Sequence, residues 1–193
     1  MKNGWRREEQ MEIREQKKYL RKEFLLRRRT LENRLERDQR ILERILHTDW
    51  YAQAQSIYTY VSYRAEVDTK KLIQQAWKDG KNVAVPKVCG EIINFYQIYS
   101  MDELEPGVKG ILEPMEHCTL REEQDAVIIV PGAVFDLERY RIGYGGGFYD
   151  RYLEMHPNYR SVALAYECQF VDSVPRQPWD RKLDCIITEE ACI

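Results

Sequence analysis

The sequence of 193 residues has few cysteines, few histidines and no long apolar run. Its five cysteines are scattered and form no Cys-x-x-Cys pair, which predicts reduced thiols rather than a zinc ribbon or a disulfide framework. No cysteine–histidine pairing is suggested, so no catalytic thiol is expected, and the three histidines are expected on the surface or satisfied by neighbours. No apolar run approaches the roughly 20 residues that cross a bilayer. Because the first residues are polar and charged, we expect no secretory signal, no membrane contact and a cytoplasmic protein.

The near-neutral net charge of −2 conceals an uneven distribution. Residues 1–46 hold 15 Lys and Arg against 9 Asp and Glu, a net of +6. The remaining 147 residues hold 15 against 23, a net of −8. A basic beginning on an acidic body is typical of an anion-binding arm, and equally of a solvated helical surface.

The first 46 residues predict helix. Apolar residues recur there at spacings of four and seven, the period of one helical stripe: Leu20, Phe24, Leu31, Leu35, Leu42 and Leu46. Thr30, followed by Leu-Glu-Asn, is typical of a helix N-cap, so two helices with a break near residue 30 are preferred over one coiled coil. Residues 1–14 lack a stripe and are predicted to form an extension, flexible or helical.

Beyond residue 55 the pattern changes to strands of nearly continuous Val, Ile and Ala that alternate with helices. The predicted strands are 56–63, 82–88, 93–98, 125–132, 161–166 and 184–188; the predicted helices are 69–80 and one from about residue 148. Residues 101–124 are predicted to form a loop. This order indicates an α/β fold, a single three-layer domain over residues 15–193 with a mostly parallel sheet and an N-terminal helical arm.

Four of the ten glycines stand within five positions, in the segment RIGYGGGFYD that begins at Arg141. Glycines let backbone N–H groups approach phosphate oxygens, and the N-terminus of the following helix favours anions. The segment matches neither G-x-G-x-x-G, because Phe148 stands at the third glycine, nor the P-loop, because no Gly-Lys-Ser/Thr follows. From these residues alone, a flexible turn and a phosphate-binding loop stay equally open.

The side chains around the glycines also allow two interpretations. The guanidinium of Arg141 suits bidentate contact with phosphate. Asp150 suits either an interaction with the dipole of the following helix or a magnesium ligand. The rings of Tyr144, Phe148 and Tyr149 either pack the loop or offer flat surfaces to a heteroaromatic ligand.

This segment, together with VPGAVFD at residues 130–136, resembles the signature of the 5-formyltetrahydrofolate cyclo-ligase family. Further segments resemble the family in the same order, over about residues 17–190: KKYLRK at 17–22, EVDT at 66–69, GILEP at 110–114, ALAY at 163–166 with Gln169, and WDRKLD at 179–184. There are departures. Arg139 stands where the family usually has glycine, Phe148 replaces the commoner tyrosine, and Asp180 follows Trp179 instead of the usual histidine.

The resemblance implies a ligase that converts 5-formyltetrahydrofolate into 5,10-methenyltetrahydrofolate while ATP becomes ADP and phosphate in the presence of Mg²⁺. It also implies a fold similar to the NagB/RpiA/CoA-transferase-like fold. The implied catalytic residues are Lys17, Arg141 and Tyr149, and the implied magnesium ligands are Asp150 and Asp180. The implied ATP-binding residues are Lys17, Lys18, Tyr19, Leu20, Arg21, Arg141, Ile142, Gly143, Tyr144, Gly145, Gly146, Gly147, Phe148 and Tyr149. The implied folate-binding residues are Val61, Glu66, Tyr144, Gly145, Gly146, Gly147 and Phe148.

Other interpretations stay open beside this one. Arg27, Arg28 and Arg29 match no family position and are expected on a solvated helix surface. A nucleic-acid-binding protein would bind its ligand with the basic arm, although the nine acidic residues interspersed there weaken the attraction for phosphate. Another sugar-phosphate or CoA-handling enzyme could use a related fold. We expect small-molecule substrates, a folate with or without a polyglutamate tail and ATP, no nucleic acid, and a monomer.

Overall fold

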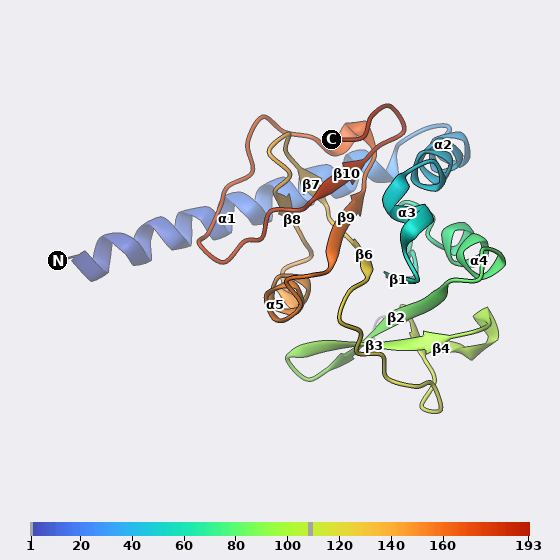
Figure 1. The fold of residues 1–193 in the computed structure, drawn as a ribbon. Coiled ribbons are helices and arrows are strands. Elements are labelled where there is room, and N and C mark those ends of the chain that lie inside the picture. Colours follow the sequence, from blue (N-terminus) through green and yellow to red (C-terminus); the bar gives the residue numbers. More distant parts are fainter. Residues whose placement is uncertain (1, 108–109) are drawn as a thin grey trace.

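The computed structural model describes residues 2–107 and 110–193, with the side chains of the first helix described from Met11 onward. Its N-terminal helix α1 (Lys2–Arg29) extends from the body of the molecule (Figure 1). Residues 2–14, predicted as an extension, are the first part of this helix. The helices α2 (Arg34–Leu46) and α3 (Asp49–Gln53) follow.

The predicted break near residue 30 is confirmed, but the role given to Thr30 is wrong. The Thr30 hydroxyl donates to the carbonyl of Arg27 at 3.0 Å, so this residue closes α1 instead of opening α2. The N-cap position of α2 belongs to Asn33, whose φ of 54° is in the left-handed region. Asparagine tolerates that conformation better than most residues, which is why the chain can turn sharply here.

The central sheet has six strands in the order β10-β9-β6-β1-β2-β3 among the described residues. Every neighbouring pair is parallel except β2 and β3, which form an antiparallel hairpin. The strands are β1 (Ser56–Thr59), β2 (Asn82–Cys89), β3 (Ile92–Ile98), β6 (Val127–Val130), β9 (Arg160–Leu164) and β10 (Cys185–Ile187). The predicted α/β fold with a mostly parallel sheet is confirmed. The expected likeness to the NagB/RpiA/CoA-transferase-like fold stays a prediction.

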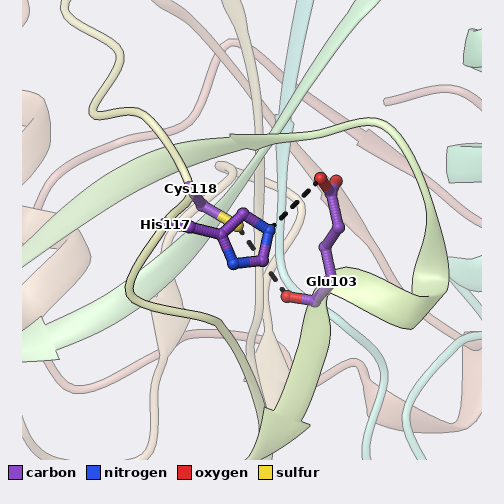
Figure 2. Close-up of side chains that lie close together, drawn as sticks. All are labelled: Glu103, His117 and Cys118. Atoms are coloured by element: carbon purple, nitrogen blue, oxygen red, sulfur yellow. Dashed lines mark hydrogen bonds and ion pairs between the residues drawn. The ribbon is translucent and has the colours of Figure 1, made fainter.

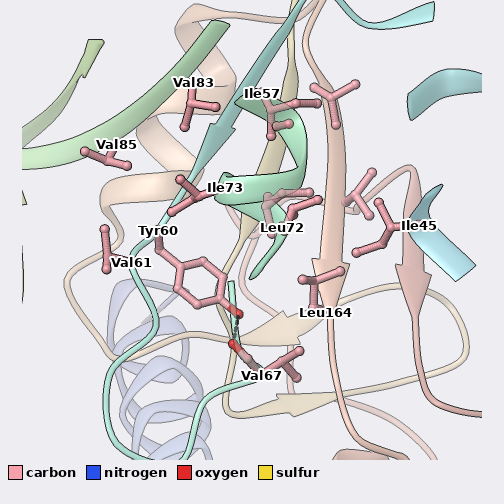
Figure 3. Packing of buried hydrophobic residues seen from close by; sticks show 14 of the residues in the cluster. Ile45, Ile57, Tyr60, Val61, Val67, Leu72, Ile73, Val83, Val85 and Leu164 are labelled. Atoms are coloured by element: carbon pink, nitrogen blue, oxygen red, sulfur yellow. Dashed lines mark hydrogen bonds between the residues drawn. The ribbon is translucent and has the colours of Figure 1, made fainter. Parts of the chain in front are cut away.

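Both faces of this sheet are buried, which explains the nearly continuous apolar strands. Ile57 and Ile129 pack with α2, α3 and α4 (Lys70–Lys78) on one face, as Figure 3 shows in part. The alternate residues Tyr58 and Ile128 pack on the opposite face with α5 (Phe148–Met155). Figure 1 shows the helices on the two sides of the sheet. Each fully buried Ile or Leu contributes roughly 1.5–3 kcal/mol, so the two clusters hold the three layers together.

Two small sheets lie outside the central one, and the sequence pattern did not predict either. Part of the predicted loop 101–124 forms the 3₁₀ turn η1 (Met101–Glu103) and the antiparallel strands β4 (Leu104–Pro106) and β5 (Leu112–Pro114). The loop prediction is therefore wrong for these residues, because each strand reads Leu-Glu-Pro and so has no run of apolar residues by which a strand is recognised.

The second small sheet positions the glycine segment. It pairs β7 (Val134–Phe135) with β8 (Arg141–Ile142), and the 3₁₀ turn η3 (Glu167–Gln169) follows β9.

None of the helices that the structure describes is long and apolar enough to span a membrane.

Candidate active site

A cleft of about 650 Å³ lies between α1, the glycine segment and the loop before β10. Three parts of the chain that are far apart in sequence form its walls. The lining residues are Arg14, Glu15, Lys17, Lys18 and Arg21 from α1; Arg141, Ile142, Gly143, Gly145, Gly146, Gly147, Asp150, Arg151 and Glu154 around the glycines and α5; and Gln177, Trp179 and Asp180. Six cations against four carboxylates give the lining a net positive charge, which favours an anion.

The cations of α1 enter the cleft from one face of the helix. Lys17 and Arg21 are one helical turn apart, so their side chains point the same way. The Lys17 ammonium is buried and forms an ion pair with Asp180. The Arg21 guanidinium donates from Nε to the carbonyl of Gly143 at 2.7 Å. Burial lowers the pKa of Arg21 from its usual value, a cost that a bound anion would offset.

The glycines are required by backbone conformation and by close packing. Gly145 and Gly147 have φ values of +104° and +64°, which side chains strain to adopt. A Cβ on Gly146 would lie 2.5 Å from the ring of Phe148. Gly147 is the N-cap residue of α5 and offers no side chain to the first N–H groups of that helix. Those N–H groups are therefore available to an anion at the helix N-terminus.

Two buried donors at the cleft lack a protein acceptor. Arg141 is almost fully buried; its Nη2 lies 3.2 Å from Asp150 Oδ1, and its Nη1 has no hydrogen-bond partner among the described residues. The Nε2 of Gln177 also has no hydrogen-bond partner among the residues that the structure describes. Buried polar groups normally have partners, so unpaired donors that line one cleft indicate an acceptor-rich ligand such as a polyphosphate.

The carboxylates of Asp150 and Asp180 fit a magnesium ion bound together with phosphate. Asp150 uses Oδ1 for Arg141 and for the Arg181 N–H at 3.2 Å. Asp180 uses Oδ2 for Lys17 and for the Gln177 N–H at 2.7 Å. The second oxygen of each carboxylate makes no hydrogen bond to described residues. Since Mg²⁺ is usually held by one or two carboxylates, water and substrate phosphates, two free oxygens at one cleft are a suitable donor set.

On its other side, the glycine segment reaches a second polar group. The Tyr144 hydroxyl donates to Glu66 Oε1 at 2.5 Å and accepts from Arg28 Nη2 at 2.9 Å. Glu66 Oε2 accepts the Tyr63 N–H at 2.9 Å. Tyr144 is 46% exposed overall, but its hydroxyl is enclosed between these partners; burial and the Glu66 carboxylate raise its pKa above the usual range. The tyrosine therefore stays protonated and donates.

Family comparison gives the clearest match for this arrangement. Residues 13–189 match the model of the 5-formyltetrahydrofolate cyclo-ligase family. The chain belongs to this family. It is 32% identical over 172 residues to the 5-formyltetrahydrofolate cyclo-ligase of Escherichia coli K12, covering 84% of this chain and 94% of the relative. The Haemophilus influenzae enzyme of the same name is also 32% identical, over 151 residues, with 74% of this chain and 80% of the relative covered.

A solved structure supports the same assignment. The fold superimposes on the solution structure of 5,10-methenyltetrahydrofolate synthetase from Aquifex aeolicus with a TM-score of 0.79. The two chains are 32% identical, and the match covers 91% of each.

Not every residue that the family resemblance implied lies at the cleft. Tyr19 is 68% exposed on α1, and Leu20 packs against the apolar cluster around Phe24. Lys18 reaches the rim, where it pairs with Glu15. Val61 is buried in the main core, so it can offer a ligand only an edge.

The two remaining aromatic residues pack toward the sheet. Phe148 and Tyr149 contact the cluster that contains Phe95. The Tyr149 hydroxyl has no hydrogen-bond partner among the described residues, and burial, followed by the nearby Glu66 charge, holds its pKa well above the usual range. It is thus a third unpaired donor beside the glycine segment.

Arg28 is the main residue bonded to this part of the structure that sequence reasoning missed. It was expected on a solvated surface, but it is 5% exposed and donates to the Gly132 carbonyl at 3.2 Å as well as to Tyr144. The signal was present in the spacing: Lys17, Arg21, Phe24 and Arg28 follow one another at four, three and four residues, a single helix face. A basic residue on the stripe of Phe24 faces the body of the protein.

Proposed function

We propose that this chain converts 5-formyltetrahydrofolate into 5,10-methenyltetrahydrofolate with ATP and Mg²⁺. Membership of the cyclo-ligase family supports the reaction. The observation that carries the assignment of roles is the position of the glycine segment, which borders the cationic cleft and also carries Tyr144, bound to Glu66. The glycine segment thus borders two sites: the cationic cleft, which suits a polyphosphate, and the surroundings of Glu66, which suit a ring with N–H donors.

The chemistry requires activation of a poor leaving group. The oxygen of the formyl group that is bonded to N5 of the folate attacks the γ-phosphorus of ATP. The bond between the γ-phosphorus and the β–γ bridging oxygen breaks and releases ADP. N10 then attacks the activated formyl carbon, loses its proton, and the carbon–oxygen bond breaks to release phosphate. The protein forms no covalent bond; it aligns the two substrates and neutralises charge, as phosphoryl-transfer enzymes do.

In this proposal Lys17, Arg21 and Arg141 bind the ATP phosphates. The unpaired Nη1 of Arg141 and the N–H groups at the start of α5 supply donors that are already in position. Asp150 and Asp180 would hold magnesium, which shields the phosphate charges when bound. The ion pairs of these aspartates with Arg141 and Lys17 would then be partly exchanged for contacts to metal and phosphate.

The folate side of the site is built around Glu66. Its Oε1 carboxylate oxygen, which now accepts from Tyr144, would accept N–H bonds from the amino-pyrimidine part of the pterin. Tyr144, Phe148 and Tyr149 would border the ring system. Val61 would supply at most an apolar edge, and Tyr19 and Leu20 are left out of the proposed contacts because neither lines the cleft.

The basic side chains of α1 point toward the body of the protein, which argues against the alternative that this helix binds nucleic acid. Lys17, Arg21 and Arg28 all bind groups of this chain, so they are not displayed as an external basic stripe. We include a cytoplasmic location in the proposal, supported by the five cysteines, which are free thiols. A monomeric state is a further part of the proposal.

The direct test mixes the purified chain with 5-formyltetrahydrofolate, Mg²⁺ and ATP and follows the near-ultraviolet absorbance of the methenyl product. We expect turnover that depends on both ATP and metal. Asp150→Asn, which keeps the shape of the side chain, should lower turnover about 100-fold or more. Lys22→Met is the matched control because Lys22 is exposed on α1 and away from the cleft. A folded wild-type chain without turnover would refute the function, and an active Asp150→Asn would refute only the metal role.

A further inference from the structure

A cluster of three different metal-binding side chains lies outside the cleft, at one end of the small sheet of β4 and β5. Figure 2 shows Glu103, His117 and Cys118 close together. One ligand atom of each lies within 4.8 Å of those of the other two, and Glu103 Oε1 is 3.5 Å from His117 Nε2. It is the single group of three or more histidine, cysteine and acidic side chains at such distances in the described part of the chain.

The backbone that carries these residues is fixed on both sides. The Met115 N–H donates to the Glu103 carbonyl at 2.9 Å, directly beside the first pair of the β4–β5 ladder, Leu104 and Pro114. The Cys118 N–H donates to the Met115 carbonyl at 3.1 Å and closes the turn. The two segments that supply the ligands are therefore held together without a metal.

The side chains are also directed toward a common point. Glu103 Oε2 accepts the N–H groups of Tyr99 at 2.5 Å and Ser100 at 3.2 Å, which leaves Oε1 facing His117. Such hydrogen bonds orient a ligand carboxylate. The Cys118 thiol is enclosed and its sulfur lies 3.8 Å from the Glu103 carbonyl oxygen. The His117 imidazole is exposed, so it can rotate without disturbing the core.

We propose that Glu103, His117 and Cys118 bind a zinc ion, with water as the fourth ligand. Zinc accepts sulfur, nitrogen and oxygen ligands in tetrahedral geometry at about 2.0–2.3 Å, which places ligand atoms roughly 3.5 Å apart. The longest ligand-to-ligand distance, at most 4.8 Å, needs to contract by about 1.3 Å or less to reach this geometry. Binding releases the thiol proton to solvent, because the thiolate is the form that binds metal.

Ligand chemistry separates this site from the magnesium site proposed at the cleft. A thiolate and an imidazole select zinc over magnesium, whereas Asp150 and Asp180 offer only carboxylate oxygens. Lys87 reaches over from β2, and its Nζ donates to the Pro114 carbonyl at 3.1 Å. Burial raises the pKa of the Cys118 thiol, whereas the Lys87 charge lowers it and so favours the thiolate, although the same charge repels a cation. An ion bound here would link residues 117 and 118, which follow β5, to Glu103 of η1, which precedes β4. It would thus cross-link the two segments that flank the small sheet.

The test titrates the full-length chain, freed of metal by a chelator, with Co²⁺ as a spectroscopic substitute for Zn²⁺. We expect one equivalent to bind with a thiolate-to-cobalt charge-transfer band. Zn²⁺ should abolish the band by displacement, while excess Mg²⁺ should leave it. Cys118→Ser should remove the band, and His117→Ala should weaken binding at least tenfold. Because His117 is exposed, its replacement leaves the fold intact, and Zn²⁺ should raise the melting temperature of wild type but not of this variant.

Matched controls come from the other cysteines. Cys89→Ser removes a thiol of β2 and should leave the titration unchanged. Cys192→Ser should do the same. It tests the place among the described residues where two thiols meet, since the sulfurs of Cys185 and Cys192 lie 3.1 Å apart. Wild type without a charge-transfer band, or a band that survives in Cys118→Ser or disappears in Cys192→Ser, would overturn the proposal. Cyclo-ligase turnover should be unchanged in all four variants, so failure here is distinct from failure of the proposed function.

Discussion

Replacing Arg139 by glycine should stabilise the protein. Arg139 lies in the turn between β7 and β8 with φ of 70°, one of three non-glycine residues with positive φ in the described chain. The turn is fixed on each side: Tyr140 N–H donates to Asp136 Oδ1 at 2.9 Å, and the Arg139 carbonyl accepts the Leu183 N–H at 3.0 Å. These bonds should hold the same backbone conformation in the variant, so the substitution relieves strain without changing the turn.

The magnitude follows from two opposing contributions. A side chain in the left-handed region costs roughly 1–2 kcal/mol. Glycine returns about 0.5–1 kcal/mol of this as additional backbone entropy of the unfolded chain. The buried Nε of Arg139 has no hydrogen-bond partner among the described residues, and its removal is common to the glycine and alanine variants, so it cancels when these two are compared. The net gain is about 0.5–1 kcal/mol, which corresponds to a rise of roughly 1–4 °C in melting temperature for a chain of this size.

Thermal unfolding of wild type, Arg139→Gly and Arg139→Ala measures this directly. The alanine variant removes the guanidinium but keeps a Cβ at the same φ, so it should melt below the glycine variant. An alanine variant as stable as the glycine variant would show that the effect comes from the side chain and would refute the backbone explanation. A glycine variant that melts below wild type would refute it as well.

Three further predictions concern the site and its surroundings. Arg28→Met should lower the affinity for the folate about tenfold or more through loss of the charged hydrogen bond to Tyr144, with the KM for ATP little changed. Arg27→Met, at an exposed position, should have no effect. Equal losses for both substrates in Arg28→Met would contradict the assignment. Gly146→Ala should cost about 1–3 kcal/mol in unfolding experiments because its Cβ would meet the Phe148 ring, whereas Gly143→Ala, with open space around it, should be neutral. Burial lowers the pKa of His156, so folding favours the neutral imidazole. The free energy of unfolding should therefore fall as the pH decreases from the usual histidine pKa of 6.5 toward the folded pKa. His156→Phe should flatten this pH dependence in urea titrations at several pH values, and an unchanged dependence of the unfolding free energy on pH would contradict it.

The sequence supports the fold prediction where periodicity is long. Six buried strands and the helices between them were recognisable because each carries several apolar residues in a row or on one face. The strands of the two small sheets, β4, β5, β7 and β8, have no such signal, since they form only through pairing with partners held by the rest of the structure.

The site was predictable where residues belong to an ordered motif, and less so where they act through tertiary contacts. The glycine segment, Lys17 and Asp180 do line one cleft. Arg28 carries no local signature, and only the packing of α1 against β7 and η3 makes it a buried partner of Tyr144. Gln177 was missed for the same reason: an isolated glutamine in a loop has no pattern, and its unpaired amide is visible only in three dimensions.

The contacts of α1 have a consequence for synthesis of the chain. Lys17 binds a residue 163 positions further on, Arg21 one 122 positions further on, and Arg28 one 104 positions further on. Because α1 is synthesised before these partners, the helix must wait for most of the residues that follow it before its cations find their partners. Until Asp180 has emerged, the nascent protein carries an amphipathic, positively charged helix without a docking surface, and the cleft can be completed only after translation of the last residues that line it.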